Sequence, residues 1–262
     1  MRRKRTNSLT FCALFAILGL AGCYQPTPRP QIVATEPTTV LPARLPVQRR
    51  IVGRSVENRP IECIALGQGY DVTLILATIH GNEPAGTPLV EKLAEHLQQN
   101  PDLLEGRKVV ILPLANPDGM SYNTRLNTRG VDLNRNFAAR NRENSSRNGY
   151  RALSEPEARA IHTVIHQYGP DRIISVHQPL ACIDYDGPAA HLAEHLAEHC
   201  DLPVRKLGAR PGSLGSYAGL TLRIPIITFE LPRDADQFSR EALWDRYGPA
   251  MLAAVVYPEK AK

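Results

Sequence analysis

The sequence predicts an α/β fold in which a mostly parallel sheet carries helices on both faces. Continuous runs of apolar, mainly β-branched residues, such as 72–79 (VTLILATI) and 108–114 (KVVILPL), are typical of strands that are buried on both faces. Segments with helical spacing of apolar residues alternate with these runs, which is the pattern of helices packed on a parallel sheet. The length of 262 residues suits one sizeable domain.

The beginning of the chain has the form of a bacterial export signal. A basic MRRKR segment precedes an apolar stretch at 9–20, which is too short to span a bilayer comfortably. The following Leu-Ala-Gly-Cys resembles a lipobox, so we expect residues 1–22 to be a lipoprotein signal peptide and Cys23 to carry lipid. An ordinary secretory signal or a short anchor helix is the alternative. Tyr24, in place of aspartate after the cysteine, favours anchoring in the outer membrane on the periplasmic side.

Residues 23–48 are expected to form a linker, because six prolines fall in this segment and no apolar periodicity does. The catalytic domain is expected at 49–262. Much of the formal net charge of +5 lies in the first five residues, and aromatic residues make up only 6% of the chain, which argues against a nucleic-acid-binding surface. The domain holds three cysteines, an odd number whose pairing the sequence leaves open: Cys63, Cys182 and Cys200.

The elements of the domain follow from periodicity and from local start signals. Pro84 suits the first turn of a helix, and Ser154 with Glu157 has the spacing of a capping box. In chain order we expect a hairpin at 50–67 with its turn at 57–58, a strand at 72–79, a helix at 84–99, a strand at 108–114, a helix at 154–168, a strand at 172–176, a helix at 189–199, a strand at 224–229 and a helix at 239–256.

Polar side chains follow the predicted buried strands. His80 and Glu83 follow the first strand, His177 follows the strand at 172–176, and Glu230 follows the last. In open α/β sheets, ligands bind beyond the carboxyl ends of the strands. We therefore expect these side chains to share one site.

The chemistry of this set is that of a catalytic zinc site. Such sites have three protein ligands and leave a fourth position for water, and His80, Glu83 and His177 are the candidate ligands for one Zn²⁺ ion. Zinc lowers the pKa of its water, and a second carboxylate must accept the proton, for which Glu230 is the candidate. Another divalent ion stays possible as the native metal.

Three residues of the loop at 116–137 complete the predicted site. Arg125 is the candidate donor to the oxyanion, although Arg129 lies close by in the same loop. Asn134 and Arg135 are the candidates for binding a substrate carboxylate, which a guanidinium holds with two hydrogen bonds.

A second set of histidines has metal-ligand spacing. His191, His195 and His199 recur every four residues on a predicted helix. Because they lack the strand-end context, a solvated helix face is the plainer interpretation.

The segment NPDGMSYNTRLNTRGVDLNRNF (116–137), together with HGNE, SEPE, SVH and TFELP, closely resembles the zinc carboxypeptidase family, the funnelins. The resemblance implies an α/β sandwich around a mixed eight-stranded sheet. It also implies the metal ligands, the general base Glu230, the polarising Arg125 and the carboxylate-binding pair described above.

The resemblance is incomplete at one position. Digestive members have a mobile tyrosine roughly twenty residues before the catalytic glutamate, whereas residues 206–210 read KLGAR, and Tyr217 lies too close to Glu230 for a clear match. The segments RPGSLGSYAG (210–219) and VHQPLACIDYDGP (176–188) are similar to the murein peptide amidase subgroup. Diaminopimelate in such a substrate has an amino group for which Asp184 or Asp186 is a candidate partner; the alternative is that both acids are ordinary loop residues.

We therefore expect a zinc-dependent peptidase that hydrolyses an amide bond next to a free carboxylate end. The resemblance implies the γ-D-glutamyl–meso-diaminopimelate bond of murein peptides as its target. The alternatives are a deacylase of N-acyl amino acids, related to the aspartoacylase-like group, and a catalytically inactive wall-binding lipoprotein.

Overall fold

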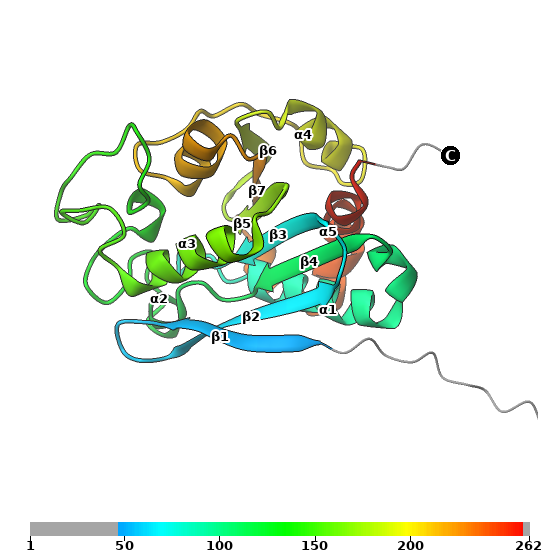
Figure 1. The fold of residues 1–262 in the computed structure, drawn as a ribbon, viewed down its shortest axis with the longest axis horizontal. Coiled ribbons are helices and arrows are strands. Elements are labelled where there is room, and N and C mark those ends of the chain that lie inside the picture. Colours follow the sequence, from blue (N-terminus) through cyan, green and yellow to red (C-terminus); the bar gives the residue numbers. More distant parts are fainter. Residues whose placement is uncertain (1–46, 259–262) are drawn as a thin grey trace, which may run out of the picture. The chain divides into compact units, whose positions relative to one another are not determined.

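The computed structural model describes residues 47–258. The predicted signal peptide, the lipidation site Cys23 and nearly all of the predicted linker therefore lie outside the described residues. Within this range a mixed sheet of seven strands carries helices on both faces, which confirms the α/β class (Figure 1). No helix of the described range combines the length and apolar character of a membrane span.

The sheet has a parallel centre and antiparallel ends. Its strands are ordered β1-β2-β4-β3-β5-β7-β6, and the four from β4 to β7 pair in parallel. The hairpin partners β1 and β2 and the outer strand β6 pair antiparallel, so the sheet is mixed and its parallel strands form the middle. The strands are β1 Gln48–Arg54, β2 Pro60–Gly67, β3 Asp71–Ala77, β4 Arg107–Leu112, β5 Arg172–His177, β6 Leu180–Asp186 and β7 Ile226–Pro232.

The predicted eighth strand is reduced to a single bridge. At the outer edge of β6, Val204 pairs in parallel with Ile183, which accepts and donates one backbone hydrogen bond on this side. Two residues after Arg205, the N–H of Leu207 donates to the Asp184 carboxylate at 2.8 Å instead of to a backbone carbonyl. A side chain thus takes over the bond that would have continued the ladder, and the segment leaves the sheet.

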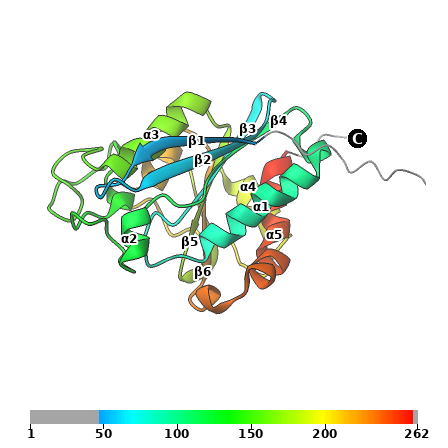
Figure 2. The ribbon, with the colours of Figure 1, turned by 90° about the horizontal axis from the view of Figure 1, so that it is seen from below.

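Helices cover the two faces of the sheet unequally. One face packs against α1, α4 and α5, and the other packs against α3 and the loops that follow β4 (Figure 2). Side chains alternate between the two cores along each strand: Ile75 and Ala77 point to the first core, and Leu74 and Leu76 to the second. The helices are α1 Gly86–Gln99, α2 Pro117–Ser121, α3 Pro156–Tyr168, α4 Ala190–Ala197 and α5 Arg240–Val256, with short turns η1 Pro101–Leu104, η2 Leu133–Arg135, η3 Ser216–Leu222 and η4 Ala235–Gln237.

The capping box predicted from Ser154 and Glu157 is wrong, and the helix predicted from Pro84 begins at Gly86. Helix α3 begins at Pro156 with Glu155 in the capping position, and no side chain caps it. Glu157 does not reach back to close a capping box. Its carboxylate instead accepts the backbone N–H of Val56 at 3.0 Å and the Asn127 amide at 3.2 Å, so a tertiary contact with the β1–β2 hairpin replaces the local one.

Candidate active site

The turn between β3 and α1 carries the first two candidate ligands. The N–H of Glu83 donates to the carbonyl of His80 at 3.1 Å, which closes the turn and aims both side chains beyond the carboxyl end of β3. Gly81 is needed here because the loops touch: a Cβ at this position would lie 1.9 Å from the carbonyl carbon of Gly119. The turn is therefore pressed against the loop that carries the substrate-binding candidates.

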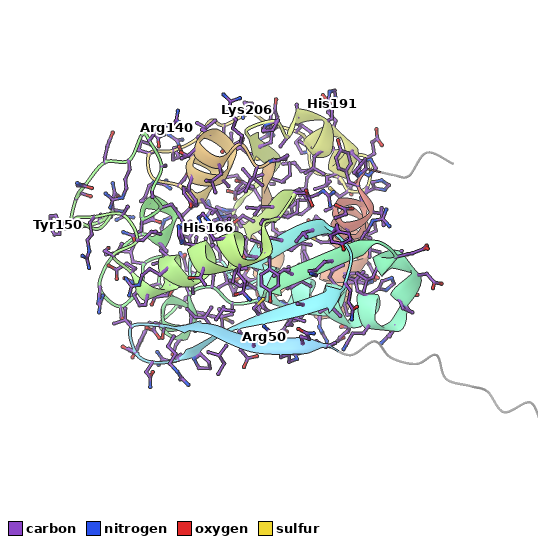
Figure 3. The ribbon with its side chains drawn as sticks, viewed as in Figure 1. Arg50, Arg140, Tyr150, His166, His191 and Lys206 are labelled. Carbon is purple, nitrogen blue, oxygen red and sulfur yellow. The ribbon has the colours of Figure 1, made fainter. Side chains whose placement is uncertain are left out.

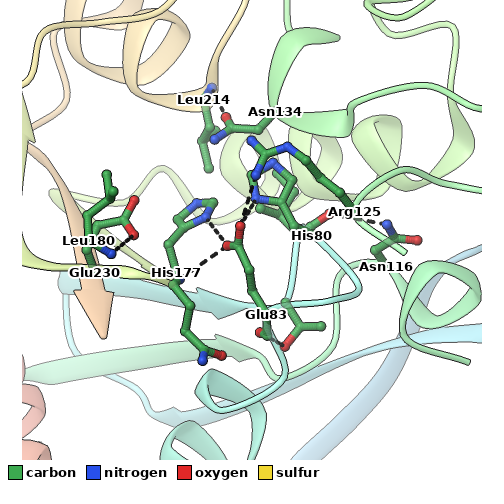
Figure 4. A network of polar contacts seen from close by, with 12 residues as sticks. His80, Glu83, Asn116, Arg125, Asn134, His177, Leu180, Leu214 and Glu230 are labelled. Atoms are coloured by element: carbon green, nitrogen blue, oxygen red, sulfur yellow. Dashed lines mark hydrogen bonds and ion pairs between the residues drawn. The ribbon is translucent and has the colours of Figure 1, made fainter. Parts of the chain in front are cut away.

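The third candidate ligand, His177, is the last residue of β5. Its Nδ1 lies 2.8 Å from one carboxylate oxygen of Glu83, and Nδ1 of His80 lies 2.8 Å from the other (Figure 4). The backbone N–H of Gln178 also donates to Glu83, at 3.2 Å. The ligand atoms of the three side chains all lie within 4.8 Å of one another, and all three residues are buried.

Asp132 orients His80 from the opposite side. Its Oδ1 lies 3.1 Å from Nε2 of His80, which leaves Nδ1 of the same ring for the ligand set. A carboxylate on the far nitrogen fixes the ring and its tautomer, as in the carboxylate–histidine–zinc arrangement. Asp132 is not among the site residues that the sequence predicted. The available signal was an acid two positions before Asn134 in the same loop.

The electrostatics of the site keep Glu83 ionised. Burial alone would raise its pKa, but hydrogen bonds and charge interactions with His177 and His80 outweigh burial and hold the pKa well below its usual range. For His80, burial would lower the pKa, and the contacts with Asp132 and Glu83 outweigh that effect and raise it. A buried anion with two imidazole nitrogens facing it is the donor set that zinc prefers.

Glu230 lies on β7, opposite Cys182 in the register with β6. Its carboxylate accepts the backbone N–H of Leu180 at 3.3 Å and makes no bond with the three candidate ligands (Figure 4). Burial raises its pKa, and only part of that rise is offset by His177. The residue thus stands beside the ligand set as a separate carboxylate with a spare oxygen.

Arg125 lies at the site, and Arg129 does not. Arg125 donates to Glu83 at 3.0 Å and to Asp132 at 3.1 Å, whereas Arg129 lies 3.6 Å from Glu155, near the start of α3. Of the two arginines that the sequence left open, Arg125 is therefore the one placed beside the candidate ligands.

Asn134 and Arg135 enter the cleft from η2. Asp132 begins this turn by accepting the N–H of Asn134, and the Asn134 side chain accepts the N–H of Leu214 at 2.8 Å. Burial lowers the pKa of Arg135, and the positive charges of Arg125 and Arg210 lower it further. An anion in the cleft would compensate this concentration of positive charge.

One cleft of about 270 Å³ is lined by all the predicted site residues of the domain: His80, Glu83, Arg125, Asn134, Arg135, His177 and Glu230. The predicted substrate contacts Asp184 and Asp186 line it too, together with Gln178, Leu180, Leu207 and Arg210. A larger hollow of about 690 Å³, between β2 and η1, has no histidine or cysteine among the described residues that line it. The smaller cleft is the candidate site because the reactive side chains converge there.

Two further expectations have a structural outcome. Tyr217 is buried, and its hydroxyl lies 2.8 Å from Nε2 of His166, so no tyrosine from the described range lines the cleft. The thiols of Cys63, Cys182 and Cys200 are all free.

The second histidine set is only partly assembled. His195 and His199 meet Glu198 with ligand atoms within 4.8 Å, while His191 points out from the exposed side of α4 (Figure 3). This group is half-buried or exposed, in contrast to the buried set at the sheet edge.

Comparison with known proteins identifies the class. The family model described as zinc carboxypeptidase (Peptidase_M14) matches residues 45–187, more than half of the chain, so the chain belongs to the zinc carboxypeptidase family and is a hydrolase. The family implies zinc, and the two histidines and one glutamate of the buried set fit that ion.

Within this family, several of the similar proteins are murein peptide amidases. The chain is 37% identical over 212 residues to murein peptide amidase A of Escherichia coli (strain K12), covering 73% of this chain and 85% of the relative. It is 32% identical over 177 residues to murein peptide amidase A of Vibrio campbellii, covering 61% and 68%. The solved structure of murein-tripeptide amidase MpaA from Escherichia coli O157 superposes with a TM-score of 0.68 at 28% identity, covering 83% of this chain and 95% of that one. Carboxypeptidase A from Helicoverpa armigera, at 21% identity, a TM-score of 0.66 and coverage of 84% and 71%, shares the fold.

Proposed function

We propose that this protein hydrolyses the γ-D-glutamyl–meso-diaminopimelate bond of murein peptides. The observation that carries the proposal is the convergence, in one cleft, of a buried His-Glu-His set, a separate carboxylate and three arginines. The likeness to murein peptide amidases supports the choice of substrate.

Each residue has a distinct task in the proposed reaction. His80, Glu83 and His177 would hold the metal, which supplies a Lewis acid and a water of lowered pKa when bound. Glu230 receives the proton of the attacking water through its spare oxygen and passes it to the leaving amine.

Two basic groups act on the substrate itself. Arg125 donates to the carbonyl oxygen as negative charge develops on it, after exchanging part of its contact with Glu83 for the substrate. Arg135, with Asn134, binds the free carboxylate of the residue that follows the scissile bond, which fixes where the chain is cut.

Mass spectrometry of purified muropeptides tests the activity. Incubation with the wild-type protein should release a fragment ending in γ-D-glutamate together with diaminopimelate or a peptide that begins with it. A chelator should abolish the release, and added Zn²⁺ should restore it. Intact muropeptides after incubation with zinc-loaded protein would refute the proposal. Protein that binds no metal would favour the inactive wall-binding alternative.

We further propose that the protein acts on the periplasmic side of the envelope as an outer-membrane lipoprotein that is lipidated at Cys23. The lipobox-like sequence and the residue after the cysteine support this placement. Metabolic labelling with a lipid probe, followed by membrane fractionation, should label the wild type and leave Cys23→Ala unlabelled. Equal labelling of both proteins would refute it.

A further inference from the structure

A second group of metal-binding side chains lies at the end of α4. The segment 191–199 reads HLAEHLAEH, so the pattern His-x-x-Glu-His occurs twice in succession. In some zinc peptidases with this spacing the two histidines hold the metal, because residues four apart lie one above the other on a helix. No residue of this segment, all of which the structure describes, lines the cleft.

The structure assembles the second of the two overlapping patterns. The backbone N–H of Glu198 donates to the carbonyl of His195 at 3.3 Å, so the chain turns back at the end of α4 and keeps the glutamate beside the histidine. Ligand atoms of His195, Glu198 and His199 all lie within 4.8 Å of one another. His191 is not part of this set, because its side chain is 91% exposed and lies beside Glu194 (Figure 3).

The members of this set face one another without being satisfied by hydrogen bonds. Nδ1 of His195 lies 3.8 Å from Oε2 of Glu198, which is too long for a hydrogen bond. The rings of His195 and His199 meet edge to face, with their centres 5.0 Å apart. A tetrahedral zinc ion with bonds of about 2.0–2.1 Å holds its ligand atoms about 3.3 Å apart. A shift of about half an ångström would therefore bring Nδ1 and Oε2 onto one ion.

The second nitrogen of the His195 ring is also without a partner. Its Nε2 is enclosed by protein, and no hydrogen bond from the described residues reaches it. An imidazole that binds a cation through Nδ1 keeps its proton on Nε2. The Tyr257 ring packs against His195 with the ring centres 5.4 Å apart, and an aromatic ring is a weak acceptor for such an N–H. A cation on Nδ1 would thus fix the tautomer of a ring that otherwise has no hydrogen bond in the described part of the chain.

We propose that His195, Glu198 and His199 form a second metal site, which binds a divalent transition-metal ion such as Zn²⁺ or Cu²⁺ and takes no part in the hydrolytic reaction. Imidazole ligands suit these ions, whereas Mg²⁺ and Ca²⁺ prefer oxygen ligands. The bound ion links the last turn of α4 to the turn that follows it. Because the ligands come together only in the folded chain, binding stabilises the fold.

Zinc stoichiometry tests this site separately from the cleft. Metal-free full-length protein is dialysed against increasing concentrations of Zn²⁺, and elemental analysis gives the zinc bound per chain. The wild type is compared with His195→Gln, His199→Gln, His80→Gln and His191→Gln. The last variant is the matched control, since it removes a histidine from the same helix but not from the set. Thermal unfolding of the metal-free proteins reports whether each variant is folded.

At the zinc concentration that just fills both sites of the wild type, we expect two ions per chain in the wild type and in His191→Gln, and about one in the other three variants. Glu198→Gln should weaken the second ion by at least about 10-fold, because even an outer partner of a metal ligand contributes that much. An excess of Mg²⁺ should not displace the second ion. His195→Gln should cleave muropeptides as the wild type does.

Three results would overturn the inference. The first is a single ion per chain in the wild type at every zinc concentration. The second is a second ion that persists when His195→Gln and His199→Gln are combined, because the ion would then lie elsewhere on the surface. The third is an equal loss of the second ion in His191→Gln. None of these results bears on the proposed hydrolysis, which the muropeptide assay tests by itself.

Discussion

Two buried carboxylates, Asp118 at the start of the loop that follows β4 and Glu83 in the turn that follows β3, differ in their partners. Under the β1–β2 hairpin, Asp118 accepts hydrogen bonds from the Ser55 hydroxyl at 2.6 Å, the Glu57 N–H at 2.9 Å and Arg59 at 2.6 Å. At the sheet edge, Glu83 also accepts from a guanidinium and from a backbone N–H, those of Arg125 and Gln178. What it has in addition is the imidazole nitrogens of two histidines, at 2.8 Å each.

This difference in partners indicates that Asp118 is a structural carboxylate and that Glu83 is a candidate metal ligand. Hydroxyl, backbone N–H and guanidinium groups only donate to Asp118 in this arrangement, so they saturate the carboxylate. An imidazole nitrogen accepts as well as donates, so two imidazoles and a carboxylate that face one another can all turn lone pairs to one cation. Burial and a lowered pKa are common to both carboxylates and do not distinguish them.

The largest effect is expected at Glu230, a carboxylate of the site that is neither saturated like Asp118 nor part of the candidate ligand set like Glu83. Glu230→Gln removes the proton acceptor while leaving the ligands in place. We expect kcat to fall by about 10²- to 10⁴-fold, the usual contribution of general acid–base catalysis. Steady-state kinetics on the diaminopimelate tripeptide would measure the loss, and elemental analysis should find the zinc content unchanged. A variant with near wild-type kcat would remove Glu230 from the mechanism.

At the hairpin, the effect should fall on stability and not on metal. Asp118→Asn leaves the buried Ser55 hydroxyl and the Glu57 N–H with a poorer acceptor, so the free energy of unfolding should drop by about 2–3 kcal/mol. Urea denaturation measures the change. Glu62→Gln is the matched control, because the Arg49–Glu62 pair is exposed and its loss should cost less than about 1 kcal/mol. Loss of zinc in folded Asp118→Asn would contradict the division between the two groups.

A third prediction concerns Asp132, which contacts the His80 nitrogen that faces away from the candidate ligand set. Asp132→Asn keeps the shape but weakens the hold on Nε2 of His80, and we expect zinc affinity to fall by about 10- to 100-fold. Competition with a fluorescent chelator measures the dissociation constant. Asp118→Asn, assayed in parallel, should keep its affinity within a factor of about three, since its carboxylate makes no contact with the ligands. Equal losses in both variants would point to a general loss of structure.

The smallest expected effect is a pH dependence at Glu157. Burial raises the pKa of Glu157 above the ordinary 4.5, so the folded protein binds its proton more tightly than the unfolded chain does. The resulting stabilisation is fully present below pH 4.5 and is lost as the pH rises through the folded-state pKa. The free energy of unfolding of Glu157→Gln should lack this part of the slope. Urea titrations of both proteins from pH 4.5 to neutrality, on zinc-free samples, would measure it, and parallel curves would exclude it.

Local patterns were enough to predict the residues that follow the strands. Buried apolar runs place the carboxyl ends of β3, β5 and β7 near His80, His177 and Glu230, although β3 already ends at Ala77 and β7 continues past Glu230 to Pro232. This works because parallel strands place their carboxyl ends at one edge of the sheet, so residues distant in sequence meet without any knowledge of their contacts. The wall beyond β6 was not predictable in the same way, since the expected eighth strand stops after one bridge.

The sequence by itself thus determined the α/β class, the candidate ligand set His80, Glu83 and His177, and the separate carboxylate of Glu230. Only the tertiary structure decided which partner each charged group takes. Asp132 contacts His80, Glu157 accepts a backbone N–H of the β1–β2 hairpin, and Asp184 accepts the backbone N–H of Leu207. The physical reason is range. Periodicity is set within a few residues, whereas these hydrogen bonds join groups 23 to 101 positions apart, and many donors compete for each buried carboxylate until packing brings one within reach.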